Sequence, residues 1–276
     1  MTARIDAHVH LWDRATDPQD WIDPTTMAPI DRDFGSDDLG RMLAATGMER
    51  AVLVQSSNSL AESVRLSLSD PRVVAGLVAW VDVAQDIRPQ LDQVRAGSVP
   101  VVGVRHLAHI DPDPEWMLRP DIEEGLAALG REGLAFDLVV RDWQLPQAAR
   151  VAARLEDVAF VLDHLGGPLA EDADASRWAD GIRLLAARPN VTAKVSGLGS
   201  GPPEGRSEEQ LRRVVGTALE AFGPDRLLYG SDWPLAELGG GAPAWRETFD
   251  TLVSELSESE RDALLGGNAV RVYSLD

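Results

Sequence analysis

The chain has 276 residues, of which 44% are hydrophobic and 26% charged, a composition that supports a sizeable buried core. Its formal net charge of −19 repels phosphate backbones and anionic lipid, so neither nucleic acid nor a membrane is an expected partner. The absence of cysteine excludes disulfide scaffolds, thiol nucleophiles and cysteine-ligated zinc sites.

The first residues, MTARIDAHVHLWD, lack the apolar segment of a secretory signal and lead at once into a strand-like run. The longest apolar stretch, residues 73–81, is too short to cross a bilayer. We therefore expect a cytoplasmic protein.

Short β-branched runs alternate along the chain with longer stretches of helical period, which is the pattern of a parallel sheet covered by helices. The predicted strands are residues 5–12, 51–56, 73–83, 101–107, 135–141, 159–165, 191–197 and 226–232. The predicted helices include 37–46, 60–68, 207–222 after a capping box, and a last helix from 257 toward 273. Eight such units, without a G-x-G-x-x-G turn, predict a single domain over residues 1–276 with a (β/α)8 TIM-barrel fold.

The first predicted strand carries His8 and His10, two residues apart. Because side chains alternate along a strand, both imidazoles should point to the same side, where they could hold a divalent metal or polarise a carbonyl oxygen. An isolated H-x-H pair is equally compatible with core or surface histidines.

Two further reactive residues fall at the predicted ends of other strands. His164 follows strand six in DHLGGP, and Asp232 follows strand eight in YGSDWP. The active sites of such barrels lie at the C-terminal ends of the strands, so we expect His8, His10, His164 and Asp232 to converge there. Asp232 could accept a proton from water, although a loop-capping role is the alternative.

Other residues near the predicted strand ends are candidates for substrate binding: Arg105, His106, Arg141, Lys194 and Trp233. A buried cation is costly unless it meets an anion, so Arg105 and Lys194 either grip the substrate or form structural ion pairs. A tryptophan at this position stacks on a sugar-like ring or packs in the core.

Several segments together resemble the amidohydrolase-related lactonases, a group that contains L-fuconolactonase, L-rhamnonolactonase and 2-pyrone-4,6-dicarboxylate lactonase. The matching segments are IDAHVHLWD, VAGLVAWVDV, GVRHLAHIDPDPEWMLRPD, LAFDLVV, FVLDHLGGP, VTAKVSGL, RLLYGSDWP and GNAVRVYSL. The resemblance implies a distorted barrel of the amidohydrolase type that hydrolyses a lactone. It also implies that Asp232 is the general base, that the three histidines orient water or polarise the carbonyl, and that Arg105 and Lys194 face the substrate.

The chain departs from the wider amidohydrolase pattern on strand five, where residues 136–141 contain no histidine, and on strand four, which has Arg105 and His106 in place of a bridging lysine or glutamate. A two-metal centre is therefore not expected. We expect either no required metal or one divalent ion, most simply zinc, on His8, His10 and Asp232. The loop RDWQLP after strand five also departs from the sugar-lactonase pattern, which leaves the substrate open.

Three functions remain open from the sequence. The first is hydrolysis of a small polar lactone, derived from a sugar acid, with an organic acid as product. The second is zinc-dependent decarboxylation of an aromatic or muconate-type acid, which the missing histidine on strand five disfavours. The third is a barrel that binds a ligand without catalysis.

Overall fold

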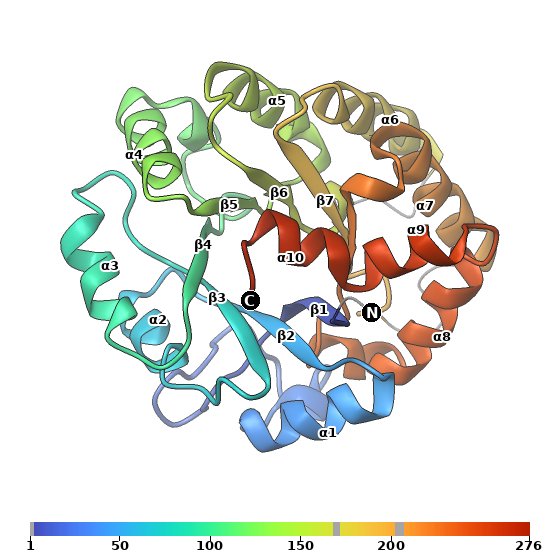
Figure 1. The fold of residues 1–276 in the computed structure, drawn as a ribbon, viewed down its shortest axis with the longest axis horizontal. Coiled ribbons are helices and arrows are strands. Elements are labelled where there is room, and N and C mark those ends of the chain that lie inside the picture. The colour runs from blue at the N-terminus through green and yellow to red at the C-terminus, as the bar shows by residue number, and fades with distance from the viewer. Residues whose placement is uncertain (1–2, 168–171, 202–206) are drawn as a thin grey trace.

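The computed structural model describes residues 3–167, 172–201 and 207–276. Eight parallel strands follow one another around a barrel in chain order (Figure 1). The strands are β1 (Ile5–Val9), β2 (Arg50–Val54), β3 (Val74–Ala79), β4 (Val101–His106), β5 (Ala135–Leu138), β6 (Phe160–Leu162), β7 (Val191–Val195) and β8 (Leu227–Tyr229). This arrangement confirms the predicted (β/α)8 barrel.

Helices form a ring outside the strands (Figure 1). They are α1 (Ser36–Thr46), α2 (Leu60–Leu66), α3 (Arg88–Arg95), α4 (Pro120–Arg131), α5 (Leu145–Arg154), α6 (Asp172–Ala186), α7 (Glu208–Phe222) and α8 (Ala242–Leu252). The predicted capping box is present at the start of α7, where the Ser207 hydroxyl accepts from the backbone N–H of Gln210.

The barrel closes between its first and last strands beyond the regular ends of both. The backbone N–H of His10 donates to the carbonyl of Trp233 over 2.7 Å, and the N–H of Asp232 donates to the carbonyl of His8 over 2.9 Å. A parallel bridge joins Val9 to Trp233. These bonds bring the two histidines of β1 beside the aspartate that follows β8.

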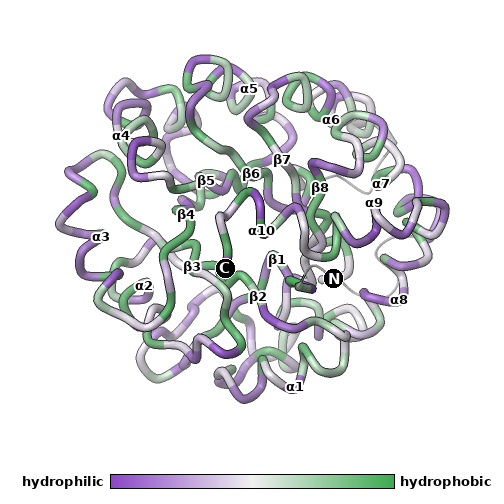
Figure 2. The backbone as a smooth tube through the Cα atoms, viewed as in Figure 1, coloured by the Kyte–Doolittle hydropathy of each residue, from purple (hydrophilic) through white to green (hydrophobic). Residues whose placement is uncertain are grey.

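Two apolar layers hold the fold together. The larger layer lies mainly between the strands and the outer helices, and includes Leu53, Phe136 and Phe249, all with at most 1% of their surface exposed. A smaller cluster includes Val52, Val161 and residues near the C-terminus. Figure 2 shows the matching hydropathy, with hydrophobic strands at the centre and many hydrophilic positions on the surrounding helices. Burial of this apolar area supplies the main driving force for folding.

The C-terminal segment differs from the single helix that the sequence predicts. It comprises α9 (Glu258–Asp262), a π-helical turn (Ala263–Gly267) and α10 (Asn268–Val272), with non-helical dihedral angles at Gly266. A Cβ on Gly266 would lie 1.9 Å from the carbonyl oxygen of Ala3, so the helix bends where it packs against the start of the chain. α10 crosses one end of the barrel (Figure 1).

Two buried polar residues fix α10 to the barrel. Asn268 donates to the carbonyls of Pro224 and Leu227 at the start of β8. The hydroxyl of Tyr273 lies 2.9 Å from each carboxylate oxygen of Asp137 on β5, inside the barrel. The C-terminal segment therefore contacts the barrel interior from the N-terminal end of the strands.

Several strands are shorter than predicted, most clearly β6 and β8. Residues Asp163–Gly166 form a 3₁₀ turn in place of the end of the sixth predicted strand. β8 ends at Tyr229, so Asp232, the predicted last residue of this strand, lies outside it. Both segments leave the sheet in left-handed backbone conformations, which a strand cannot contain. In the described residues, no helix is long and apolar enough to cross a membrane.

We predict that Tyr273→Phe lowers the free energy of unfolding by about 1–3 kcal/mol, because Asp137 loses a buried hydrogen-bond donor. Urea denaturation measures the change. Tyr229→Phe is the matched control, since the buried hydroxyl of Tyr229 has no hydrogen-bond partner among the described residues. Equal losses of stability in the two variants would contradict the assigned role of the Tyr273 hydroxyl.

Candidate functional site

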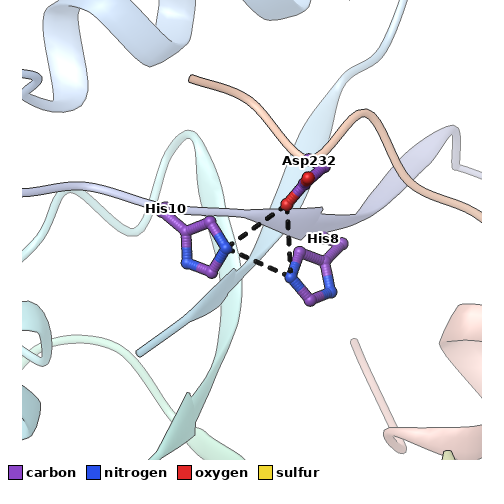
Figure 3. Close-up of side chains that lie close together, drawn as sticks. All are labelled: His8, His10 and Asp232. Atoms are coloured by element: carbon purple, nitrogen blue, oxygen red, sulfur yellow. Dashed lines mark hydrogen bonds and ion pairs between the residues drawn. The ribbon is translucent and has the colours of Figure 1, made fainter. Parts of the chain in front are cut away.

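Three side chains meet at the end of the barrel where β1 and β8 close (Figure 3). The Nε2 atoms of His8 and His10 are 3.2 Å apart. The Oδ1 atom of Asp232 lies 3.7 Å from Nε2 of His8 and 3.5 Å from Nε2 of His10. The structure therefore brings together the first three residues that the sequence selects.

His164 completes the cluster from the turn after β6. Its Nε2 atom lies 4.0 Å from Oδ1 of Asp232, and its Nδ1 atom is 2.9 Å from the hydroxyl of Ser196. The imidazole rings of His8 and His164 lie 4.5 Å apart, measured between their centroids. Three imidazoles thus surround one carboxylate oxygen.

The backbone is strained at two of these residues. His164 and Asp232 have φ angles of 52° and 59°, in the left-handed region that costs a residue with a side chain about 1–3 kcal/mol. His164 packs closely against Gly197, since a Cβ atom added to Gly197 would lie only 2.6 Å from Nδ1 of His164. Glycine at position 197 thus gives the His164 ring the space it occupies.

The hydrogen bonds of His8 and His10 show which ring nitrogens carry a proton. Val54 offers a carbonyl 2.8 Å from Nδ1 of His10, so this nitrogen donates and Nε2 keeps its lone pair. Arg105 can only donate, and its Nη1 atom is 3.4 Å from Nε2 of His8, so this nitrogen is also an acceptor. Two lone pairs and a carboxylate oxygen therefore face one point.

Such a donor set fits a small cation. Ligands about 2.1 Å from a tetrahedral zinc ion are about 3.4 Å from one another, and the three donors here are separated by 3.2, 3.5 and 3.7 Å. The bond from Nδ1 of His10 to a carbonyl is also typical of a metal-binding histidine. His8, His10 and Asp232 therefore form a group suited to one divalent metal ion.

A group of buried charges supports His8 from the inner side. The Nζ atom of Lys194 is 2.5 Å from Asp137, 3.0 Å from Asp163 and 3.1 Å from Nδ1 of His8. Arg105 forms a 2.8 Å ion pair with Asp163. The two cations and two carboxylates balance one another, as the low dielectric of the interior requires.

The electrostatic surroundings leave the carboxylate of Asp232 charged and the imidazoles of His8 and His164 neutral. Burial raises the pKa of Asp232, but His164, His10 and His8 more than offset that effect and hold it well below its usual range. Burial lowers the pKa of His8 far below its ordinary value, and burial also lowers the pKa of His164. An ionised carboxylate beside neutral imidazoles can accept a proton from water near neutral pH.

A pocket of about 480 Å³ opens onto this cluster. Asp232, His10 and His164 lie in its lining together with Arg105 and Arg141. The remaining lining residues are Trp21, Ser56, Leu107, His109, Ile110, Val139, Val140, Asp163, Gly167, Gly197, Ser200 and Leu235. A ligand of the size of a sugar lactone can therefore reach the cluster.

Three of the five expected substrate-binding residues lie outside the pocket lining. Lys194 has no exposed surface and is paired with two aspartates, which corrects its expected substrate contact in favour of a structural ion pair. His106 stacks on Trp116 and bonds to Asp111. Trp233 is buried, with its ring 5.1 Å from that of Phe34.

The structure also places residues in the pocket that the sequence interpretation overlooked. Ser200 donates a 2.7 Å hydrogen bond to Oδ2 of Asp232, opposite the oxygen that faces the histidines. His109 lines the pocket after β4. Ser200 and His109 both lie outside the predicted strands, so no strand period shows where their side chains point. The matching segment that ends in DHLGGP extends to Pro168, which lies outside the described residues.

We predict that chelator-treated protein takes up one zinc ion per chain and that uptake raises its melting temperature. His10→Ala should abolish both responses, because it removes one of three donors. Calorimetric titration with zinc and a thermal scan measure them. His106→Asn is the control and should keep the stoichiometry of one, since its ring faces Asp111 and Trp80. Undiminished uptake by His10→Ala would refute this ligand set.

The family model described as amidohydrolase matches residues 5–275. An L-fucono-1,5-lactonase of Burkholderia ambifaria is 34% identical over 287 residues, which cover 100% of this chain and 97% of the relative. A second L-fucono-1,5-lactonase, from Burkholderia multivorans, is 32% identical and covers 99% of this chain and 96% of the relative.

Solved structures are also similar to this chain along nearly its whole length. The crystal structure of an amidohydrolase from Burkholderia multivorans with bound zinc superposes with a TM-score of 0.89 at 32% identity, and covers 99% of this chain and 100% of that one. The same kind of protein with bound HEPES gives a TM-score of 0.91 at 31% identity. With its family match over residues 5–275 and its relatives above 30% identity across nearly the whole chain, this protein belongs to the amidohydrolase family.

Proposed function

We propose that this protein is a hydrolase that opens a small polar lactone, derived from a sugar acid, to the corresponding hydroxy acid. One observation carries the proposal: an ionised, buried carboxylate, Asp232, lies among three imidazoles at the base of an open pocket. The names of the two relatives, both L-fucono-1,5-lactonase, support a lactone as the substrate.

The proposed reaction begins with a water molecule beside Asp232. The carboxylate accepts a proton as the water oxygen attacks the lactone carbonyl carbon, while the Nε2 lone pairs of His8 and His10, with His164 beside them, orient the water. The bond from the carbonyl carbon to the ring oxygen then breaks. Asp232 returns the proton to the ring oxygen, which becomes the new hydroxyl group, and the product is released as a hydroxy acid.

His8, His10 and Asp232 are the residues that would hold a divalent ion, and His164 lies next to them. When bound, such an ion supplies Lewis-acid chemistry, polarising a carbonyl group and lowering the pKa of water. The Nδ1 atom of His8 donates to Asp163, and that of His10 donates to the carbonyl of Val54. These two bonds fix the orientation of both rings.

The proposal is tested with a panel of aldonolactones and a pH indicator that reports acid release. Hydrolysis of one or more of these lactones is the expected result. Carbon dioxide release from an aromatic acid by the zinc-loaded protein, with no lactone hydrolysed, would replace the proposal with a decarboxylase. Tight binding of a lactone without turnover would indicate a binding protein.

We predict that Asp232→Asn lowers the turnover of the best lactone by about 100- to 10,000-fold, because the amide cannot accept the proton of water. The acid-release assay measures this, and circular dichroism checks that the variant remains folded. Turnover within a few-fold of the parent protein would remove Asp232 from the role of base.

We predict that Ser200→Ala lowers kcat by about 10-fold with little change in KM, because Asp232 loses the donor that fixes its Oδ2 atom. Ser200→Thr keeps a hydroxyl and should restore most of the rate. Equal kcat values for the alanine variant and the parent would show that the hydrogen bond has no positioning role. A loss in the threonine variant as large as that in the alanine variant would show the same.

A further inference from the structure

One wall of the pocket is distant in sequence from the residues of the catalytic cluster. It is formed by the segments that follow β4 and β5, and its apolar members are Leu107, Ile110, Val139 and Val140. His109 also lines the pocket and lies between Leu107 and Ile110 in the sequence. A titratable side chain in an apolar wall of a binding pocket is unusual and requires an explanation.

His109 differs from the other four histidines of the chain in its hydrogen bonds. His8, His10, His106 and His164 each have at least one ring nitrogen in a hydrogen bond to another residue. For His109, the Nδ1 atom is shielded from solvent and has no hydrogen-bond partner among the described residues. The ring therefore has hydrogen-bonding capacity that the protein itself does not use.

The surroundings of His109 keep its ring neutral. Burial lowers its pKa to about 4, and the guanidinium groups of Arg141 and Arg105 act in the same direction. A neutral imidazole has one donor and one acceptor nitrogen, and a hydroxyl group can pair with either, since it both donates and accepts. The adjacent guanidinium groups can only donate and do not replace it in this role.

The apolar residues beside His109 make this hydrogen-bonding position selective. A substrate hydroxyl that reaches the wall at His109 leaves water and gains a partner there. A methylene at the same position leaves the imidazole without that partner. Elsewhere in this wall, a hydroxyl would meet aliphatic side chains or the guanidinium group of Arg141, which donates hydrogen bonds but does not accept them.

We propose that His109 determines specificity by hydrogen bonding to a hydroxyl group on the lactone ring or its side chain, away from the carbonyl carbon that reacts at Asp232. The inference rests on the proposed lactone hydrolysis and extends it to the class of substrate, a lactone with a hydroxyl group at one defined position. His109 is a substrate-binding residue in this scheme and takes no part in proton transfer.

The test compares lactones that differ by one hydroxyl group. Each accepted aldonolactone is assayed beside analogues that lack a single hydroxyl, with the parent protein and with His109→Leu and His109→Gln. For the parent, we expect one deoxy analogue to have a kcat/KM about 10- to 100-fold lower than its hydroxylated partner. In His109→Leu this ratio should fall to within a few-fold of one, and in His109→Gln it should be partly kept.

Ile110→Val is the matched control, because it changes the same wall without removing a hydrogen-bonding group. It should preserve the ratio between the two lactones, whatever it does to both rates. A ratio in His109→Leu equal to that of the parent would overturn the inference. Equal losses on both lactones would also overturn it, since they would show a structural role.

A binding measurement separates the two proposals. Calorimetry with the hydroxy acid and its deoxy counterpart needs no turnover, and the difference in affinity between them should disappear in His109→Leu. If the parent hydrolyses no lactone, the proposed function fails while this binding difference still tests His109. If lactones are hydrolysed but neither the rates nor the affinities depend on His109, only the further inference fails.

Discussion

The geometry of the candidate site depends on the contact between the His8 ring and a group of buried charges. His8 has no exposed surface, and its Nδ1 atom lies within 3.3 Å of both Asp163 and Lys194. These two residues are in turn paired with Arg105 and Asp137, so each buried charge has a partner of opposite sign. Because removing one member would leave an uncompensated charge in a low-dielectric interior, the group acts as a unit. This group of charges holds the His8 ring and so sets the direction in which its Nε2 lone pair points.

Backbone strain adds a second constraint at the opposite side of the cluster. His164 and Asp232 both lie in the left-handed region, directly after short strands. A strand at either position would point these side chains along the sheet normal. The turns instead direct these side chains toward β1. Gly197 leaves room for the ring of His164, and Gly230 leaves room for His8. The fixed arrangement of metal-ligand and proton-accepting atoms therefore comes with local backbone strain, which is common at functional sites.

The sequence predicts the barrel and the main cluster well, for physical reasons. Buried parallel strands are continuous apolar runs that stand out from amphipathic helices, and reactive residues at the C-terminal ends of such strands must share one end of the barrel. His8, His10 and Asp232 could therefore be grouped before their distances were known. The strand ends were less predictable, since the turn at His164 depends on tertiary packing against β7.

The roles of individual polar residues were harder to predict. Lys194 and Arg105 both belong to strands. Only contacts across the barrel show that Lys194 is buried between carboxylates, whereas Arg105 reaches the pocket. Ser200 and His109 lie in loops, where no periodicity indicates which way a side chain points. Such residues become visible only when distant segments of the chain are placed beside one another.

The position of α10 has a consequence for the buried charges that support His8. Tyr273 follows α10 and bonds to Asp137, which belongs to the same charge group as the His8 ring on β1. With α10 displaced from the barrel, Asp137 would keep Lys194 as a donor but lose the hydroxyl of Tyr273. A helix at the N-terminal end of the strands therefore takes part in fixing a histidine whose reactive nitrogen faces the opposite end of the barrel.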